Sequence, residues 1–360
     1  MSELQYIFVH GLSGWGRYDA QYARMPYWGM RNGDLIKHLN DNGYHAYAAS
    51  VAPRGSAWDR ACELYAQLTG TITDYGKAHS EKYGHTRYGK DFSADPLIQV
   101  WDKQHPLVLI GHSFGGATIR IFAHLIKQGC EEERACTAAE ELSGFFAGGN
   151  EERPIKALIT LAAPHNGTTA YDLYEDPDFD VNSIHIPWIY RRLSAMMSRG
   201  NTPVQDGRDS RDYAPFDMHI DEADRLNRKL SVSSDIYYFS IPCSASVRKP
   251  DGTYRPVYKK MEPLFTKSSI LMGIYEGRSR GGIPLGKEWQ ENDGLVNTIT
   301  AMAPSHQPSC AYTYDMTPAP GIWNILPVYP YDHMSLQGGL MRRHSVTAFY
   351  DTLLKKISTL

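Results

Sequence analysis

Short apolar runs alternate along the chain with stretches in which apolar residues recur at helical spacing. Runs rich in β-branched and aromatic residues, set between helical patterns, predict a mainly parallel sheet covered by helices. The runs 106–113 and 155–164 are apolar almost throughout, which suits strands buried on both faces. The predicted strands are 6–11, 44–52, 106–113, 155–164 and 235–242.

Two segments interrupt this alternation. Residues 54–93 follow the second predicted strand, and residues 168–234, rich in Asp, Arg, Pro and Tyr, are interpreted as an inserted cap. Within the cap, residues 185–200 predict an amphipathic helix whose apolar face either packs on the body of the protein or roofs a cleft. The residues that define this helix are Pro187 near its first turn, Ile189, Leu193, Met196 and Met197 on the apolar face, and Gly200 at its end.

Composition and charge restrict the possible functions. The 360 residues, 42% of them hydrophobic, can bury the core of one large domain over 1–360. A net charge of −3 with scattered Lys and Arg argues against nucleic acid as a partner. No apolar run approaches the roughly 18 residues of a transmembrane segment, and the first residues enter a strand without a basic leader. Five cysteines without CxxC spacing argue against a disulfide framework or a thiolate metal site.

The strand at 106–113 leads through GHSFG (111–115) into a helical pattern. A G-x-S-x-G sequence alone is weak evidence in a chain with 31 glycines, but between a buried strand and a helix it indicates a nucleophile elbow. In such an elbow the two glycines let neighbouring backbone pass closely while the serine hydroxyl is presented in a strained turn. Ser113 is therefore the predicted nucleophile.

A serine hydroxyl reacts when a base removes its proton, and a carboxylate must orient that base, in the chain order Ser, acid, His. Asp293, in a tight Asn-Asp-Gly turn, is favoured as the acid over Asp315, which lies in a run that resembles a strand. His333, in a proline-punctuated loop, is favoured as the base. His344 falls inside the terminal helical pattern, and His306 follows Asp293 too closely to leave a strand between them.

Attack on a carbonyl creates an oxyanion, which needs two backbone N–H donors, each worth roughly 3–4 kcal/mol of transition-state stabilisation. One donor follows the nucleophile, at Phe114. The other is expected in the loop HGLSGWG (10–16), where glycines let the backbone curl around Leu12. The predicted oxyanion hole therefore consists of the Leu12 and Phe114 N–H groups.

The first inserted segment contains an aspartate and two histidines, Asp59, His79 and His85, separated by helical and glycine-punctuated stretches. These side chains can bind a metal ion, although lone histidines and aspartates are more often solvated. Spacing alone leaves both interpretations open.

Motifs along most of the chain are VHGLSGWGR, YWGMRNGDL, LNDNGY, WDRACELYAQL, DYGKAHSEKYGHTRYG, GHSFGG, APHNGTT, WQENDGLVNT and YDHMSL. Together they resemble the zinc-containing bacterial lipases of the thermoalkalophilic Bacillus type, related to staphylococcal lipases, in the α/β-hydrolase superfamily. The resemblance implies that fold, and it implies Ser113, Asp293 and His333 as the catalytic triad, in agreement with the choices above.

The resemblance also implies a zinc site formed by Asp59, His79, His85 and an aspartate of the cap, which aligns with Asp217. Two imidazoles and two carboxylates can close a tetrahedral shell and leave no position for an activated water. The zinc is therefore expected to be structural and to tie residues 54–93 to the cap.

Three departures from the family pattern change these expectations. The relatives carry acidic calcium ligands just after the catalytic histidine, whereas this chain has Ser335 and no carboxylate before Asp351, so calcium is expected to be absent. The cap is shorter, which predicts a more open cleft for soluble or bulky esters. Phe114 replaces the glutamine of many relatives, and its side chain is expected to narrow the pocket.

The sequence thus predicts a serine carboxylic-ester hydrolase, a lipase or esterase, acting on esters with a hydrophobic acyl group, with possible lipid contact through the cap. Two alternatives stay open: a metallohydrolase with a catalytic metal at Asp59, His79 and His85, and a non-catalytic binding module on a hydrolase scaffold. Relatives of this kind are secreted, but no leader is evident, so a cytoplasmic location is the alternative. The oligomeric state is not predicted.

Overall fold

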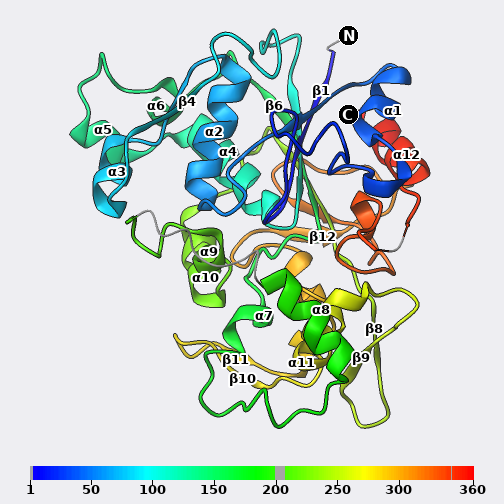
Figure 1. Ribbon diagram of the computed structural model, residues 1–360. Helices are drawn as coiled ribbons and strands as arrows, with labels where there is room; N and C mark the ends of the chain where they lie inside the picture. The colour runs from blue at the N-terminus through cyan, green and yellow to red at the C-terminus, as the bar shows by residue number, and fades with distance from the viewer. Residues whose placement is uncertain (1–2, 199–206, 342) are drawn as a thin grey trace.

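The computed structural model describes residues 3–198, 207–341 and 343–360. Its centre is a seven-stranded sheet in the order β12-β13-β7-β6-β5-β1-β2, with every neighbouring pair parallel (Figure 1). The strands are β1 (Gln5–Val9), β2 (His45–Ala49), β5 (Leu107–His112), β6 (Ile155–Leu161), β7 (Tyr237–Ile241), β12 (Ser309–Ala311) and β13 (Trp323–Ile325).

This architecture confirms the predicted fold class, an α/β-hydrolase fold with a mainly parallel sheet, and each of the predicted strands is present. The strands β12 and β13 were not predicted. Each has three residues, which is too short to show either a continuous apolar run or an alternating pattern.

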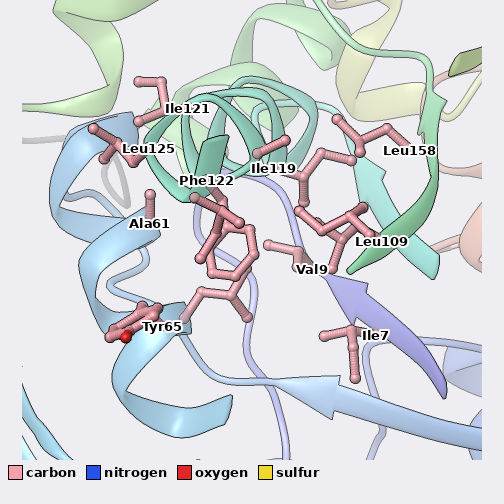
Figure 2. Close-up of a cluster of buried hydrophobic side chains, with 14 of the residues drawn as sticks. Ile7, Val9, Ala61, Tyr65, Leu109, Ile119, Ile121, Phe122, Leu125 and Leu158 are labelled. Carbon is pink, nitrogen blue, oxygen red and sulfur yellow. The ribbon is translucent and has the colours of Figure 1, made fainter. Parts of the chain in front are cut away.

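One face of the sheet packs on α2 (Ala57–Thr69) and α4 (Gly115–Gln128). Figure 2 shows Ile7 and Val9 of β1 among side chains of these two helices, beside the fully buried Phe122 of α4. Burying one such side chain contributes roughly 1.5–3 kcal/mol to folding. This layer fixes the helix that follows Ser113 against the sheet.

The other face of the sheet packs on α1 (Leu35–Asp41) and α12 (Thr347–Ile357), which lie side by side in Figure 1. Tyr6 and Phe8 point to this face because successive side chains of a strand alternate between its two sides. The central strands are buried on both faces, as their continuous apolar sequences predicted.

Residues 54–93 include α2 and add no strand to the seven-stranded sheet. The part of this segment that follows α2 lies beside that helix in Figure 1. Residues 54–93 fold as a helix, an antiparallel strand pair and a second short helix. Further short helices lie between β5 and β6. The elements beyond α2 in this part of the chain are β3 (Ile72–Asp74), α3 (Lys77–Tyr83), β4 (Tyr88–Asp91), α5 (Glu131–Cys136) and α6 (Gly144–Ala147).

Residues 168–198 and 207–234, with part of the later chain, form a layer at the end of the sheet, in the lower part of Figure 1. The predicted boundaries of the two insertions stay predictions. The elements here are α7 (Thr169–Asp172), α8 (Trp188–Ser198), α9 (Ala214–Asp217), α10 (Ile220–Lys229), β8 (Ser246–Arg248), β9 (Tyr254–Pro256), α11 (Thr266–Met272), β10 (Gly277–Arg278) and β11 (Pro284–Leu285). Single 3-10 turns are Met30–Asn32, Pro263–Phe265, Lys287–Trp289, Thr298–Ala301 and Ser335–Gln337.

The helix predicted over 185–200 is present as α8. Leu193 packs on a cluster that includes Met261 and Phe265, whereas Ile189 is 41% exposed, so the predicted apolar face is only partly buried. The side chains of Met196 and Met197, together with Gly200, lie outside the described residues. No helix in the described part of the chain is both long and apolar enough to span a bilayer.

Candidate active site and metal centre

Ser113 occupies a strained turn between β5 and α4. Its φ of 53° lies in the left-handed region, which a serine rarely adopts. A Cβ atom on Gly111 would lie 2.5 Å from the Gly115 carbonyl oxygen, and one on Gly115 would lie 2.3 Å from the Val9 carbonyl oxygen. Both flanking positions therefore require glycine, as the elbow interpretation of GHSFG predicted.

A continuous hydrogen-bond chain joins the serine to a histidine and an aspartate. Ser113 Oγ lies 2.8 Å from His333 Nε2, and His333 Nδ1 lies 2.8 Å from Asp293 Oδ2. The other carboxylate oxygen, Oδ1 of Asp293, accepts hydrogen bonds from the N–H groups of Leu295 and Val296 at 3.0 and 2.7 Å. These bonds fix the carboxylate, so the imidazole has a single orientation toward Ser113.

The structure separates the other candidate residues from this chain. Asp315 lies in an exposed turn rather than a strand, and its carboxylate accepts a hydrogen bond from Thr313. His306 pairs with Asp224 at 2.8 Å. His344 bonds to a tyrosine hydroxyl at 2.6 Å and precedes α12, so the prediction that it lies inside the terminal helix is wrong.

The site is covered in this arrangement. Ser113 is 6% exposed and His333 is 3% exposed. The ring of Phe265 contacts the ring of His333, and Met334 packs in the same apolar cluster as Leu193 of α8. The catalytic candidates are thus shielded by apolar neighbours, and the open cleft expected from the short cap stays a prediction.

The loop after β1 lies directly against the nucleophile, since a Cβ atom on Gly11 would stand 2.9 Å from Ser113 Cβ. Among the residues that the structure describes, the N–H groups of Leu12 and Phe114 have no hydrogen-bond acceptor. The Phe114 side chain is fully buried in the core between α2 and α4. It therefore does not border an open pocket, contrary to expectation.

A second hydrogen-bond chain, which the sequence did not reveal, runs behind the elbow. Gly11 N–H donates to the Tyr27 hydroxyl at 3.1 Å, and that hydroxyl lies 2.7 Å from His112 Nδ1. His112 Nε2 lies 2.9 Å from the backbone oxygen of His333. Burial lowers the pKa of His112 well below its usual value, so its neutral ring accepts from Tyr27 and donates to His333.

A second group of aspartates and histidines lies on the inserted segments. Asp59 of α2, His79 of α3, His85 and Asp212 each present one ligand atom, and these four atoms lie within 4.8 Å of one another. His79 Nε2 lies 3.1 Å from an Asp59 oxygen and 3.2 Å from an Asp212 oxygen without hydrogen-bonding to either.

The donor set fits a divalent cation. One oxygen of Asp59, one of Asp212 and both histidine Nε2 atoms are buried without a hydrogen-bond partner in the described chain. His85 Nδ1 donates to the Thr86 carbonyl at 2.9 Å, which leaves Nε2 with its lone pair free. Two imidazoles and two carboxylates without thiolate are ligands that suit zinc.

The surrounding residues hold these ligands in place. Trp58 stacks on the ring of His79 at 5.0 Å. Both carboxylate oxygens of Glu133 accept hydrogen bonds from backbone N–H groups at the start of α3, one of them that of His79 at 2.8 Å. The Arg208 guanidinium donates to Asp59 at 2.8 Å. None of these supporting residues was predicted from the sequence.

The fourth ligand position corrects the sequence prediction. Asp217 lies in α9 outside the group of four, and its Oδ2 accepts a hydrogen bond from the N–H of Ala57, at the start of α2, at 2.8 Å. Burial raises the pKa of Asp217 to about 7. The aspartate that completes the group is Asp212, in the turn before α9.

The fold and the elbow define a protein of the α/β-hydrolase class. More particularly, the chain belongs to the family described as lipase-like, C-terminal domain, whose model matches residues 3–187 and 204–356. The predicted resemblance to staphylococcal lipases is thereby confirmed.

Comparisons with single proteins agree with this family. Lipase 2 of Staphylococcus aureus is 31% identical over 92% of this chain and 50% of its own, and the lipase of Staphylococcus hyicus is 31% identical over 97% and 56%. The chain thus spans about half the length of these relatives.

Solved structures with the same fold include EstA from Clostridium botulinum, with a TM-score of 0.83, 29% identity, and coverage of 99% of this chain and 88% of that one. Lipase 1 of Pelosinus fermentans has a TM-score of 0.80 and 30% identity, with 100% of both chains covered.

Proposed function

We propose that this protein is a serine carboxylic-ester hydrolase with Ser113, His333 and Asp293 as its triad. The observation that carries the proposal is the unbroken chain of two 2.8 Å contacts that begins at a serine in a strained elbow. Membership of a lipase-like family supports the same reaction class.

In the proposed reaction, Ser113 Oγ attacks the ester carbonyl carbon as His333 Nε2 removes the hydroxyl proton. Asp293 holds the imidazole and stabilises its positive charge. The Leu12 and Phe114 N–H groups, which have no other acceptor among the described residues, bind the oxyanion. The intermediate then expels the alcohol, which takes the proton from His333, and water hydrolyses the acyl-enzyme by the same steps.

The substrate is proposed to be an ester with a hydrophobic acyl group, because the residues near His333 are apolar. Leu193 of α8 packs in the same apolar cluster as Met334, so a shift of this helix would widen access to His333. At its start Trp188 is 69% exposed and Ile189 is 41% exposed. These side chains are suited to contact a lipid surface.

The group of four ligands is proposed to hold a structural zinc ion through Asp59, His79, His85 and Asp212. When bound, the ion supplies positive charge that neutralises the facing carboxylates and joins α2 and α3 to the turn before α9. A complete protein shell leaves no coordination position for substrate. The expected absence of calcium stays a prediction.

A metallohydrolase is the second candidate, because a cavity of about 470 Å³ is lined by His79 and Asp212 among other residues. It would give small molecules access to the metal. The experiment that separates the candidates is treatment with an alkyl phosphonate ester followed by mass spectrometry. A covalent adduct on Ser113 is expected, and its absence, with ester hydrolysis that survives treatment, would favour the metal or a non-catalytic scaffold.

A further inference from the structure

Arg60 is a fully buried cation immediately after the metal-ligand candidate Asp59 on α2. The guanidinium of arginine keeps its positive charge at neutral pH. Within the described residues, no carboxylate lies at ion-pair distance from its guanidinium. The ring centre of Phe114 lies 5.1 Å from the Arg60 Cζ atom.

The guanidinium donates instead to backbone carbonyls around the loop after β1. Nη2 donates to the His10 carbonyl, and Nη1 lies 3.4 Å from the carbonyls of both Gly11 and Ala52. Nε donates to the Thr118 hydroxyl at 3.0 Å, which anchors the side chain to α4. Arginine suits this arrangement because its donors form a rigid planar fork.

The Gly11 carbonyl and the Leu12 N–H belong to one peptide group. Because that group is planar and trans, its N–H points away from its carbonyl. Hydrogen bonds that hold the Gly11 carbonyl therefore also fix the direction of the Leu12 N–H. His10 Nδ1, 2.8 Å from the same carbonyl, and Tyr27, which accepts from Gly11 N–H, hold the loop from two further directions.

We propose that Arg60 is a positioning residue for the oxyanion hole, which orients and polarises the Gly11–Leu12 peptide so that its N–H faces the reacting oxygen. A donor that is already hydrogen-bonded through its own carbonyl is polarised and donates more strongly. This inference rests on the proposed ester hydrolysis at Ser113, since it assigns the Leu12 N–H to that reaction.

A purely structural role explains these contacts less well. A buried cation is costly to desolvate, and an apolar residue of similar length would fill the same space at lower cost. Arg120, a second buried arginine, provides the contrast: it lies on α4 and donates to Asn227 at 2.6 Å, and within the described chain it makes no hydrogen bond to the loop. It serves as the matched control.

The test compares Arg60→Met and Arg60→Lys with Arg120→Met. For Arg60→Met we expect kcat for a soluble nitrophenyl ester to fall about 30- to 100-fold, below the 100- to 1,000-fold cost of losing an oxyanion donor outright. KM should change less than about threefold. Arg60→Lys, which keeps the charge but not the fork, should recover part of kcat.

The deciding readout is inhibition by a trifluoromethyl ketone, which adds to the serine and forms a tetrahedral oxyanion. Its affinity should fall in proportion to kcat/KM across the Arg60 variants. Affinity for an unreactive ether analogue of the substrate should stay constant. Arg120→Met should lose thermal stability yet keep kcat and ketone affinity within about threefold of the unmodified protein.

If Arg60 variants do not fold, Thr118→Val removes the partner of Nε while keeping the guanidinium, and it should lower kcat and ketone affinity together by about three- to tenfold. Unchanged kcat and ketone affinity in folded Arg60 variants would overturn the role of Arg60. Failure of the unmodified protein to form a phosphonate adduct at Ser113 would instead overturn the proposed hydrolysis.

Discussion

The pair His333–Asp293 and the group of Asp59, His79, His85 and Asp212 use the same residue types but differ in how their polar atoms are satisfied. Beside the elbow, each ring nitrogen of His333 has a partner at 2.8 Å, one the serine and one Asp293. In the group of four, the Nε2 atoms of His79 and His85 face carboxylate oxygens without a hydrogen bond.

The difference shows what each arrangement is suited for. A complete hydrogen-bond chain fixes the tautomer of the imidazole and gives a proton a defined route. Lone pairs that converge in a buried space repel one another unless a cation lies between them. The same two residue types therefore predict proton transfer in one region and ion binding in the other.

The largest effect is expected from removing Ser113 Oγ, the first atom of the hydrogen-bond chain to His333 and Asp293. Ser113→Ala should fold normally and lower kcat for a nitrophenyl ester by about five to six powers of ten, as removal of a triad nucleophile does. Steady-state kinetics with a thermal melt of the same sample measures both. Hydrolysis at near-normal rate by this variant would show that the elbow is not the reacting site.

Asp293→Asn should lower kcat by about 10⁴-fold, because the amide favours the wrong imidazole tautomer. Asp315→Asn is the matched control. Its carboxylate is exposed and accepts a hydrogen bond from Thr313 in its own turn, so activity should stay unchanged. Equal losses in the two variants would mean that the contact between Asp293 and His333 does not orient the base.

Changes at the proposed metal centre are expected to lower the stability of the protein more than its reaction rate. Asp212→Asn should abolish stoichiometric zinc measured by elemental analysis, and it should lower the melting temperature by on the order of 5–10 °C. Asp217→Asn should keep the ion, since Asp217 hydrogen-bonds to the start of α2 instead.

Removing the ion from the unmodified protein with a chelator should likewise lower the melting temperature more than the initial rate at room temperature. An immediate loss of activity, restored by zinc without a change in melting temperature, would assign the reaction to the metal.

The smallest predicted effect is on the pH dependence of stability, and it comes from His165, which belongs neither to the proposed triad nor to the proposed metal centre. His165 is buried beside Thr160 and Trp323, and burial lowers its pKa well below the usual 6.5. Above pH 6.5 the ring is neutral in both folded and unfolded chains. As pH falls below 6.5 the unfolded chain binds a proton that the folded one does not, so stability is lost.

Denaturant melts of the unmodified protein and of His165→Gln at pH 4.5–7.5 test this. The slope of unfolding free energy against pH should be smaller in the variant by up to about 1.4 kcal/mol per pH unit. Parallel slopes would mean that the folded protein accepts the proton on His165.

The sequence predicted the parts of the site that local signals define. Ser113 stands between glycines whose need for close backbone contact is local, and Asp293 and His333 lie in turns with recognisable residues. The long apolar strands β5 and β6 were also predicted correctly from their local sequence. The three-residue strands β12 and β13 owe their place to their neighbours in the sheet, so no local pattern marked them.

Features that depend on contacts between distant segments were missed. Tyr27 and His112 are 85 residues apart, and neither has a local signal for their hydrogen bond. The choice of Asp212 over Asp217 depends on how α9 lies against α2, which places one carboxylate at the helix start and the other among the ligands. The sequence could not distinguish these two aspartates, which are only five positions apart.

The ligand set has a consequence for how the chain folds. An ion bound by both Asp59 and Asp212 would link two points of the chain about 150 residues apart. Closing such a loop early in folding lowers the conformational entropy of the unfolded chain. Ion supply during refolding should therefore control how fast the cap docks. A chain refolded without the ion depends on packing alone to bring the two ends together.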